Sequence, residues 1–162
     1  MEGKGIRLTC HACGQVHEMD EYGQLHRTGG ETKFPHIPDW YDWQRAQVRA
    51  ALENGSYRLD TDVSIGMMVD HKALYMVGDG RLIHDENGFR LTGEDGLDYS
   101  QSPVAGHTLY SDYYFYEIGD MIGIGDNEFS YFCFPKRNVS VAKARLAVEE
   151  LYKMKKKQRV RG

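Results

Sequence analysis

No stretch of this 162-residue sequence approaches the ~18 consecutive apolar residues of a membrane-spanning helix, so we do not expect it to cross a bilayer. No charged start is followed by an apolar run and a small-residue cleavage site, which argues against a secretory signal. Three cysteines, an odd number, do not form a disulfide framework. These absences predict a cytoplasmic protein, or the cytoplasmic part of a larger one.

Several enzyme motifs are also absent. The sequence has no Gly-x-Ser-x-Gly elbow, no P-loop and no EF-hand spacing among its acidic residues. Hydrophobic residues make up 41% and charged residues 27%, which suits a folded body and not a disordered chain.

Basic charge is concentrated at the C-terminal end. Residues 153–162 contain no acid and six of the 20 basic residues, leaving 14 against 24 acids and a net charge of −10 elsewhere. Such an acidic body does not favour a nucleic-acid partner. The tail is either a solvated end or a contact for an acidic surface such as anionic membrane lipid. Its basic residues are Lys153, Lys155, Lys156, Lys157, Arg159 and Arg161.

Residues 1–33 contain a Cys-x-x-Cys motif among short strand patterns, with few large apolar residues for a core. Cys10 and Cys13 can hold one zinc ion from a tight turn, but a structural site needs four ligands, and Cys133 lies in a strand pattern. Three interpretations stay open: half of a zinc ribbon completed upstream of Met1, a metal-free thiol pair, or a redox pair. The first predicts a fragment of a longer protein or an internal start.

A single amphipathic helix is expected over residues 40–54, after a linker at 34–38. Asp39 fits its N-cap and Gly55 its C′ position. Trp40, Trp43 and the alanines that follow recur at helical spacing.

From Tyr57 to Pro135 the pattern changes to a period of two and predicts about seven antiparallel strands. Residues 78–80 are expected to form a turn between strands at 73–77 and 81–85. Asn87-Gly88 is the strongest hairpin signal. Tyr113–Ile118 is expected as a strand with Tyr114, Tyr116 and Ile118 on one face. The aromatic cluster, which comprises Tyr110, Tyr113, Tyr114, Phe115 and Tyr116, is expected mainly in the core, with part of it a binding surface.

A final helix follows, with Asn138 or Ser140 as its cap. Its apolar face consists of Ala144, Ala147, Val148, Leu151 and Tyr152. The element order predicts an α+β fold: a partial zinc-ribbon-like hairpin, a linker helix, and a pleckstrin-homology-like or GRAM-like antiparallel barrel with a C-terminal helix. The expected segments are 1–33, 34–55, 56–152 and a basic tail at 153–162.

Four motifs together carry a family resemblance: Leu8-Thr-Cys-His-Ala-Cys-Gly, Asp20-Glu-Tyr-Gly, His36-Ile-Pro-Asp-Trp-Tyr-Asp-Trp and Tyr110-Ser-Asp-Tyr-Tyr-Phe-Tyr-Glu-Ile-Gly-Asp. From about Ile6 to Tyr152, the chain resembles the region that follows the catalytic domain in some bacterial 1-acyl-sn-glycerol-3-phosphate acyltransferases. That catalytic domain and the CPxC-like knuckle of the family are absent here. Cys10 and Cys13 are the only positions of this sequence that match a functional feature of the family.

The resemblance implies a parent enzyme that converts lysophosphatidic acid to phosphatidic acid at the cytoplasmic membrane face. This chain is then a non-catalytic accessory region, docking to membrane lipid or to the catalytic domain in cis. The alternative is a small enzyme using His107 and Asp112, whose His-x4-Asp spacing is that of a base and its orienting acid in glycerolipid acyltransferases. The phosphate-binding segment that accompanies this motif is missing.

Overall fold

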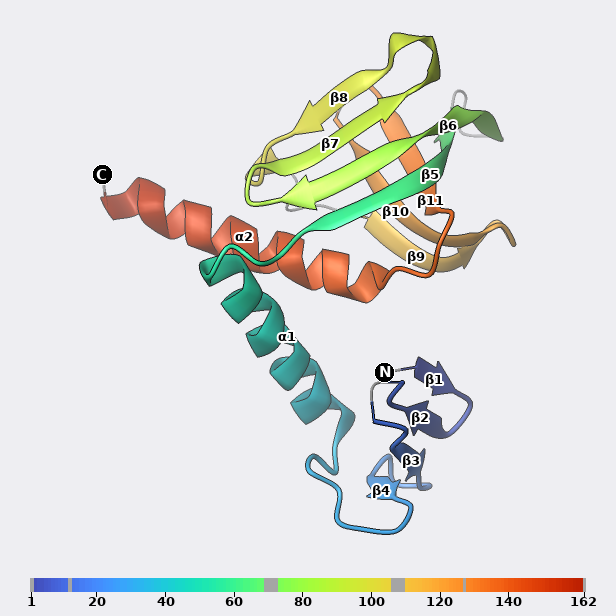
Figure 1. The fold of residues 1–162 in the computed structure, drawn as a ribbon, viewed down its shortest axis with the longest axis vertical. Helices are drawn as coiled ribbons and strands as arrows, with labels where there is room; N and C mark the ends of the chain where they lie inside the picture. The colour runs from blue at the N-terminus through green and yellow to red at the C-terminus, as the bar shows by residue number, and fades with distance from the viewer. Residues whose placement is uncertain (1, 12, 69–72, 106–109, 127, 162) are drawn as a thin grey trace. The chain divides into compact units, whose positions relative to one another are not determined.

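A computed structural model describes residues 2–11, 13–68, 73–105, 110–126 and 128–161, with only the backbone described at 159–161. Over these described residues the fold is α+β, with two α-helices, a four-stranded sheet and a seven-stranded sheet (Figure 1). Contacts divide the chain into two compact units, Met1–Ala46 and Gln47–Gly162, called unit 1 and unit 2 below. Within the described part of the chain, no helix is long and apolar enough to span a membrane.

Unit 1 contains a four-stranded antiparallel meander, whose strands are β1 (Glu2–Lys4), β2 (Arg7–Thr9), β3 (Val16–Met19) and β4 (Leu25–Arg27). Strands β3 and β4 form a hairpin, with Gly23 at φ +80° in its turn. The sequence pattern did not predict β1.

Aromatic side chains extend unit 1 beyond residue 33, where the sequence suggested a division. The Trp40 ring lies edge-on to His17, with ring centres 5.3 Å apart, and to Phe34 at 5.2 Å. The Trp40 indole N–H also donates to the Phe34 carbonyl at 2.9 Å. The first turns of α1 (Ile37–Glu53) therefore belong to the same compact unit as the meander.

The two ends of α1 differ in how well they were predicted. The expected start at residue 40 with Asp39 as N-cap is wrong, because the helix begins at Ile37 and Asp39 lies in its first turn. Pro38 is tolerated there, since first-turn N–H groups have no partner inside the helix. Gly55 at the C′ position is confirmed: its φ is +71°, and the Ser56 N–H donates to the Ala51 carbonyl at 2.9 Å.

Unit 2 contains seven strands in the order β8-β7-β6-β5-β11-β10-β9, and every neighbouring pair is antiparallel. Its core lies on one sheet face and includes Val63, Leu82, Leu91, Ile122 and Cys133, each fully buried. The strands are β5 (Leu59–Met68), β6 (Leu74–Asp85), β7 (Gly88–Gly93), β8 (Asp98–Gln101), β9 (Tyr110–Phe115), β10 (Gly119–Gly125) and β11 (Ser130–Pro135). A short 3-10 helix, η1 (Glu94–Gly96), joins β7 to β8.

Strand β6 corrects one prediction. The expected turn at residues 78–80 is wrong, because β6 continues through it and pairs with β5 between Leu74 and His84. Pairing passes from Ile65–Gly78 to Gly66–Met76, so Val77 is the extra residue of a β-bulge. Glycine is required at position 80, where a Cβ would lie 2.2 Å from the Thr92 carbonyl oxygen.

Helix α2 (Val141–Arg161) covers the core with its apolar face. Ser140 caps it, as predicted, because its hydroxyl accepts the Lys143 N–H at 3.1 Å. Ala144, Ala147, Val148 and Leu151 are buried, which confirms most of the expected face. The basic tail is not a separate segment: the helix continues through it to Arg161.

Candidate functional site

The predicted His107–Asp112 pair is only partly described. His107 lies outside the described residues. The Asp112 carboxylate accepts the Tyr110 hydroxyl at 2.9 Å and the backbone N–H of Tyr113 at 2.8 Å. Asp112 therefore uses both oxygens within its own strand, and its role as the orienting acid for a histidine base stays a prediction.

Cys10 and Cys13 occupy a tight turn between β2 and β3. The Cys10 N–H donates to the Gln15 carbonyl and the Gly14 N–H to the Cys10 carbonyl, both at 2.8 Å, while Gly14 has φ +70°. This turn suits two ligands of a tetrahedral zinc site, since glycine takes the left-handed conformation without strain. No group of three or more His, Cys, Asp or Glu able to hold a metal ion occurs among the described residues.

Cys133 belongs to the core of unit 2. Its side chain is fully buried, and burial raises the pKa of its thiol to about 12. A thiol with such a pKa is neither a ready metal ligand nor a nucleophile at neutral pH.

The basic residues of the C-terminal segment lie on the last turns of α2. Lys156 and Lys157 are exposed, and Lys155 is half-buried. The Lys153 ammonium pairs with the Glu150 carboxylate at 2.7 Å, and the Lys156 ammonium lies 5.7 Å from the centre of the Tyr152 ring. The helix thus gives these cations a defined backbone instead of a disordered one.

The aromatic cluster around β9 corrects the prediction of core packing. Tyr114 is 70% exposed, Tyr116 56% and Ile118 50%. The expected alternation ends because the chain turns at residues 116–118, between β9 and β10. Phe115 is half-buried, and its ring stacks on Phe132 with centres 5.5 Å apart.

Left-handed backbone defines this turn. The Ile118 N–H donates to the Phe115 carbonyl at 3.0 Å, and the two central residues, Tyr116 and Glu117, have φ of +52° and +59°. Positive φ at both centres is the pattern of a type I′ turn, which normally takes Asn-Gly. Tyr114 also has φ +52°, beside a register shift in the β9–β10 pairing. Three larger residues therefore adopt a conformation that costs roughly 1 kcal/mol each.

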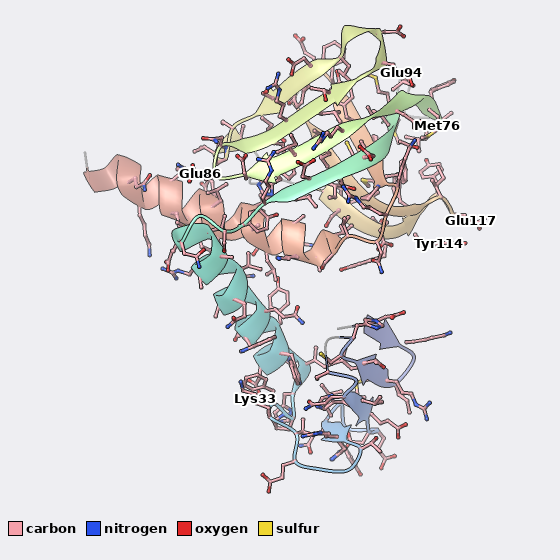
Figure 2. The ribbon with its side chains drawn as sticks, viewed as in Figure 1. Lys33, Met76, Glu86, Glu94, Tyr114 and Glu117 are labelled. Atoms are coloured by element: carbon pink, nitrogen blue, oxygen red, sulfur yellow. The ribbon has the colours of Figure 1, made fainter. Side chains whose placement is uncertain are left out.

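The segment of sequence that contains this hairpin is acidic. Between Arg90 and Lys136 the sequence has no lysine or arginine and eight acidic residues. Figure 2 shows Tyr114 and Glu117 at the same tip of unit 2. We define the acidic tyrosine surface as the exposed residues Tyr110, Tyr113, Tyr114, Tyr116, Glu117 and Asp126, which extend from β9 and the β9–β10 turn to the far end of β10.

A hollow of about 190 Å³ adjoins the acidic tyrosine surface at β10 and β11. Gly123 and Gly125 leave space in it, while Tyr110 and Phe132 supply aromatic walls. Asp126 also lines it and accepts the backbone N–H groups of residues 128 and 129 at 2.9 Å, which hold the pKa of its carboxyl below the usual value. The full lining is Gln101, Tyr110, Gly123, Ile124, Gly125, Asp126, Ser130, Tyr131 and Phe132.

No protein-family model, curated protein or solved structure matches this chain significantly. The acyltransferase resemblance therefore stays a prediction.

The turn at Tyr116-Glu117 gives a prediction about stability. Tyr116→Asn/Glu117→Gly is expected to raise the free energy of unfolding of unit 2 by about 1–2 kcal/mol, because Asn-Gly adopts positive φ with little strain. Urea denaturation measures the change. Ile118→Asn is the control: it removes an exposed apolar side chain from the same turn without relieving positive φ, and is expected to change stability by less than about 0.5 kcal/mol. A double variant no more stable than the parent would contradict the strain.

Proposed function

We propose that this chain is a non-catalytic accessory module of a membrane-associated glycerophospholipid acyltransferase, and that the basic end of α2 contacts anionic membrane lipid. The sequence resemblance supports the enzyme context. The observation that carries the lipid contact is the continuation of α2 through the lysine-rich segment to Arg161. Because the segment is already helical, its lysines need little backbone ordering to meet a charged surface.

The strand arrangement supports a pleckstrin-homology-like or GRAM-like assignment for unit 2. Strands β5–β8 form one meander and β9–β11 another, and the two are joined by the β5–β11 pair. Helix α2 lies over the core, as expected for a helix that closes one end of such a barrel. Domains with this architecture bind diverse ligands, so the fold alone does not select one.

A structural zinc ion is the second part of this proposal. Cys10 and Cys13 would supply two thiolates, and a preceding segment the other two, in a closed tetrahedral site without catalytic chemistry. Zinc analysis of a version extended upstream tests it. One zinc ion per chain, lost in Cys10→Ser/Cys13→Ser, is expected. If the extension carries two more cysteines and no zinc co-purifies, the zinc ribbon is excluded.

Lipid binding is tested by co-sedimentation of the full chain with vesicles of phosphatidylcholine, alone or mixed with anionic phosphatidylglycerol. We expect binding only to the anionic vesicles. Lys155→Gln/Lys156→Gln/Lys157→Gln is expected to weaken it about a hundredfold, since each cation near an anionic surface contributes about 1 kcal/mol.

The matched control removes three exposed cations from unit 1 by Lys4→Gln/Arg7→Gln/Lys33→Gln and is expected to leave most binding intact. Equal losses in the two triple variants, or binding that ignores anionic lipid, would contradict the role of α2. Acyl transfer from acyl-CoA by this chain alone, abolished in His107→Ala, would overturn the non-catalytic assignment.

A further inference from the structure

We infer that the acidic tyrosine surface binds a lysine- and arginine-rich segment of a protein partner, with one cationic side chain in the hollow beside Asp126. This inference goes beyond the proposed function, because it concerns a different surface and a partner of opposite charge. Three features support it: a connected aromatic platform, acidic charge without nearby basic residues in the sequence, and a strained turn.

The platform consists of rings in contact with one another. Phe115 lies 6.0 Å from Tyr110 and 4.8 Å from Tyr116, measured between ring centres. Its stacking on Phe132 ties these rings to the wall of the hollow. Tyrosine offers a large contact area and a polar tip at low entropic cost, which makes such rings effective at protein interfaces.

Charge decides which partner the platform suits. No lysine or arginine occurs from residue 91 to residue 135, whereas Glu117 stands at the hairpin tip and Asp126 lines the hollow. The Asp126 carboxylate is ionised at neutral pH, as an ordinary aspartate is, and the two backbone N–H groups it accepts lower its pKa further. A cation gains from both the carboxylates and the faces of the tyrosine rings. An anionic membrane would be repelled, so we assign the surface to a basic protein segment.

The dimensions of the hollow suit one long, flexible basic side chain. Gly123 and Gly125 contribute no side chains, and Tyr110 and Phe132 flank the space. The apolar stem of a lysine or arginine can lie along these rings while its charged end reaches Asp126.

The turn at the tip gives an independent indication of function. Tyr116 and Glu117 occupy positions where Asn-Gly would be unstrained, and Tyr114 is left-handed as well. Strained backbone of this kind concentrates at sites of function. Here its consequence is that a tyrosine and a glutamate are presented to solvent at the end of the hairpin.

The test is isothermal titration of the full chain with an oligo-arginine peptide and with an oligo-glutamate peptide. Oligo-arginine is expected to bind the parent chain, and oligo-glutamate is expected not to bind the Lys155→Gln/Lys156→Gln/Lys157→Gln variant, which removes the basic charge of α2. Glu117→Lys reverses the charge at the tip, and Ser130→Leu fills the hollow; each is expected to weaken binding about tenfold or more.

Glu86→Lys is the matched control, since it makes the same charge change at another exposed glutamate of unit 2. Figure 2 shows Glu86 and Glu117 on opposite sides of that unit. The control is expected to bind oligo-arginine within about twofold of the parent, apart from a general charge effect that salt removes. Because Glu117 is exposed, its variant is expected to fold even if Ser130→Leu does not.

Three results would overturn the inference: no binding of oligo-arginine, equal weakening by Glu86→Lys and Glu117→Lys, or vesicle binding that is lost in Tyr114→Ser while peptide binding persists. The last would assign the surface to lipid. The Lys155→Gln/Lys156→Gln/Lys157→Gln variant separates the two proposals. It is expected to lose vesicle binding and to retain oligo-arginine binding, so that either proposal can fail alone.

Discussion

Gly88→Ala is expected to lower the free energy of unfolding of unit 2 by about 3 kcal/mol. A Cβ at this position would lie 2.1 Å from the Gln101 carbonyl oxygen and 3.0 Å from the Pro103 backbone nitrogen. Both atoms are backbone, so no side-chain rotation relieves the clash. Gly88 also has φ +101°, which a residue with a Cβ rarely adopts. Strand β8, to which Gln101 belongs, has to shift.

Gly55→Ala is the matched control for this prediction. Gly55 also has a positive φ of +71°, but a Cβ there would meet no atom within 4 Å. Its replacement is therefore expected to cost only the backbone strain, about 1 kcal/mol. Urea denaturation of both variants, followed by circular dichroism, measures the difference. Equal losses would contradict the close approach of Gln101 to Gly88.

Acidification is expected to destabilise unit 2 through His84. The side chain is 1% exposed, its ring stacks on Phe89 with centres 3.9 Å apart, and its Nδ1 lies 3.0 Å from the Tyr57 hydroxyl. Burial lowers the pKa of His84 to about 4, because the charged imidazolium loses its hydration. Between about pH 6.5 and about pH 4, His84 is therefore neutral in the native state but protonated in the unfolded state.

The direction of the change in stability with pH follows from how many protons the native and unfolded states bind. Between about pH 6.5 and about pH 4 the unfolded state holds more protons on this residue, so stability falls as the pH falls. The contribution of neutral, buried His84 to the free energy of unfolding is complete above pH 6.5 and is lost by about pH 4, a change of about 3 kcal/mol.

Urea midpoints measured from neutral pH down to about pH 4 test this prediction. Tyr57→Phe/His84→Leu replaces both members of the buried pair with apolar side chains and is expected to flatten the dependence on pH. His36→Gln, a change at an exposed histidine, is expected to retain it. A double variant whose stability still falls as steeply as that of the parent would assign the acid sensitivity to other groups.

Sequence reasoning succeeded where a feature depends on its nearest neighbours in the chain. Gly55 ends α1 and Ser140 caps α2, as predicted. A hairpin joins β6 to β7 at the predicted place, but its turn residues are Glu86 and Asn87, and Gly88 already pairs with Asp85 as the first residue of β7. The turn that carries Cys10 and Cys13 is also local, because its hydrogen bonds and the left-handed Gly14 lie within a few residues of the cysteines. In these cases backbone conformation and short-range hydrogen bonds decide the structure.

Predictions failed where partners distant in the sequence decide the outcome. Gly78-Asp79-Gly80 reads as a turn, yet β5 pairs with all three residues and β7 pairs with Gly80, which keeps them within one strand. The tyrosines near residue 114 read as core, yet a turn without the usual Asn-Gly signal exposes them. The signal that was available is the absence of lysine and arginine from residue 91 to residue 135, which marks this segment of the sequence as acidic.

The sequence by itself determined the α+β class, the apolar face of α2, the cysteine pair and the concentration of basic charge at the C-terminal end. The tertiary structure decided that this charge lies on a helix, that β6 is continuous, and that Tyr110, Asp126 and Phe132 border one hollow. The reason is that periodicity and capping are local, whereas strand pairing brings together residues whose separation along the chain carries no signal.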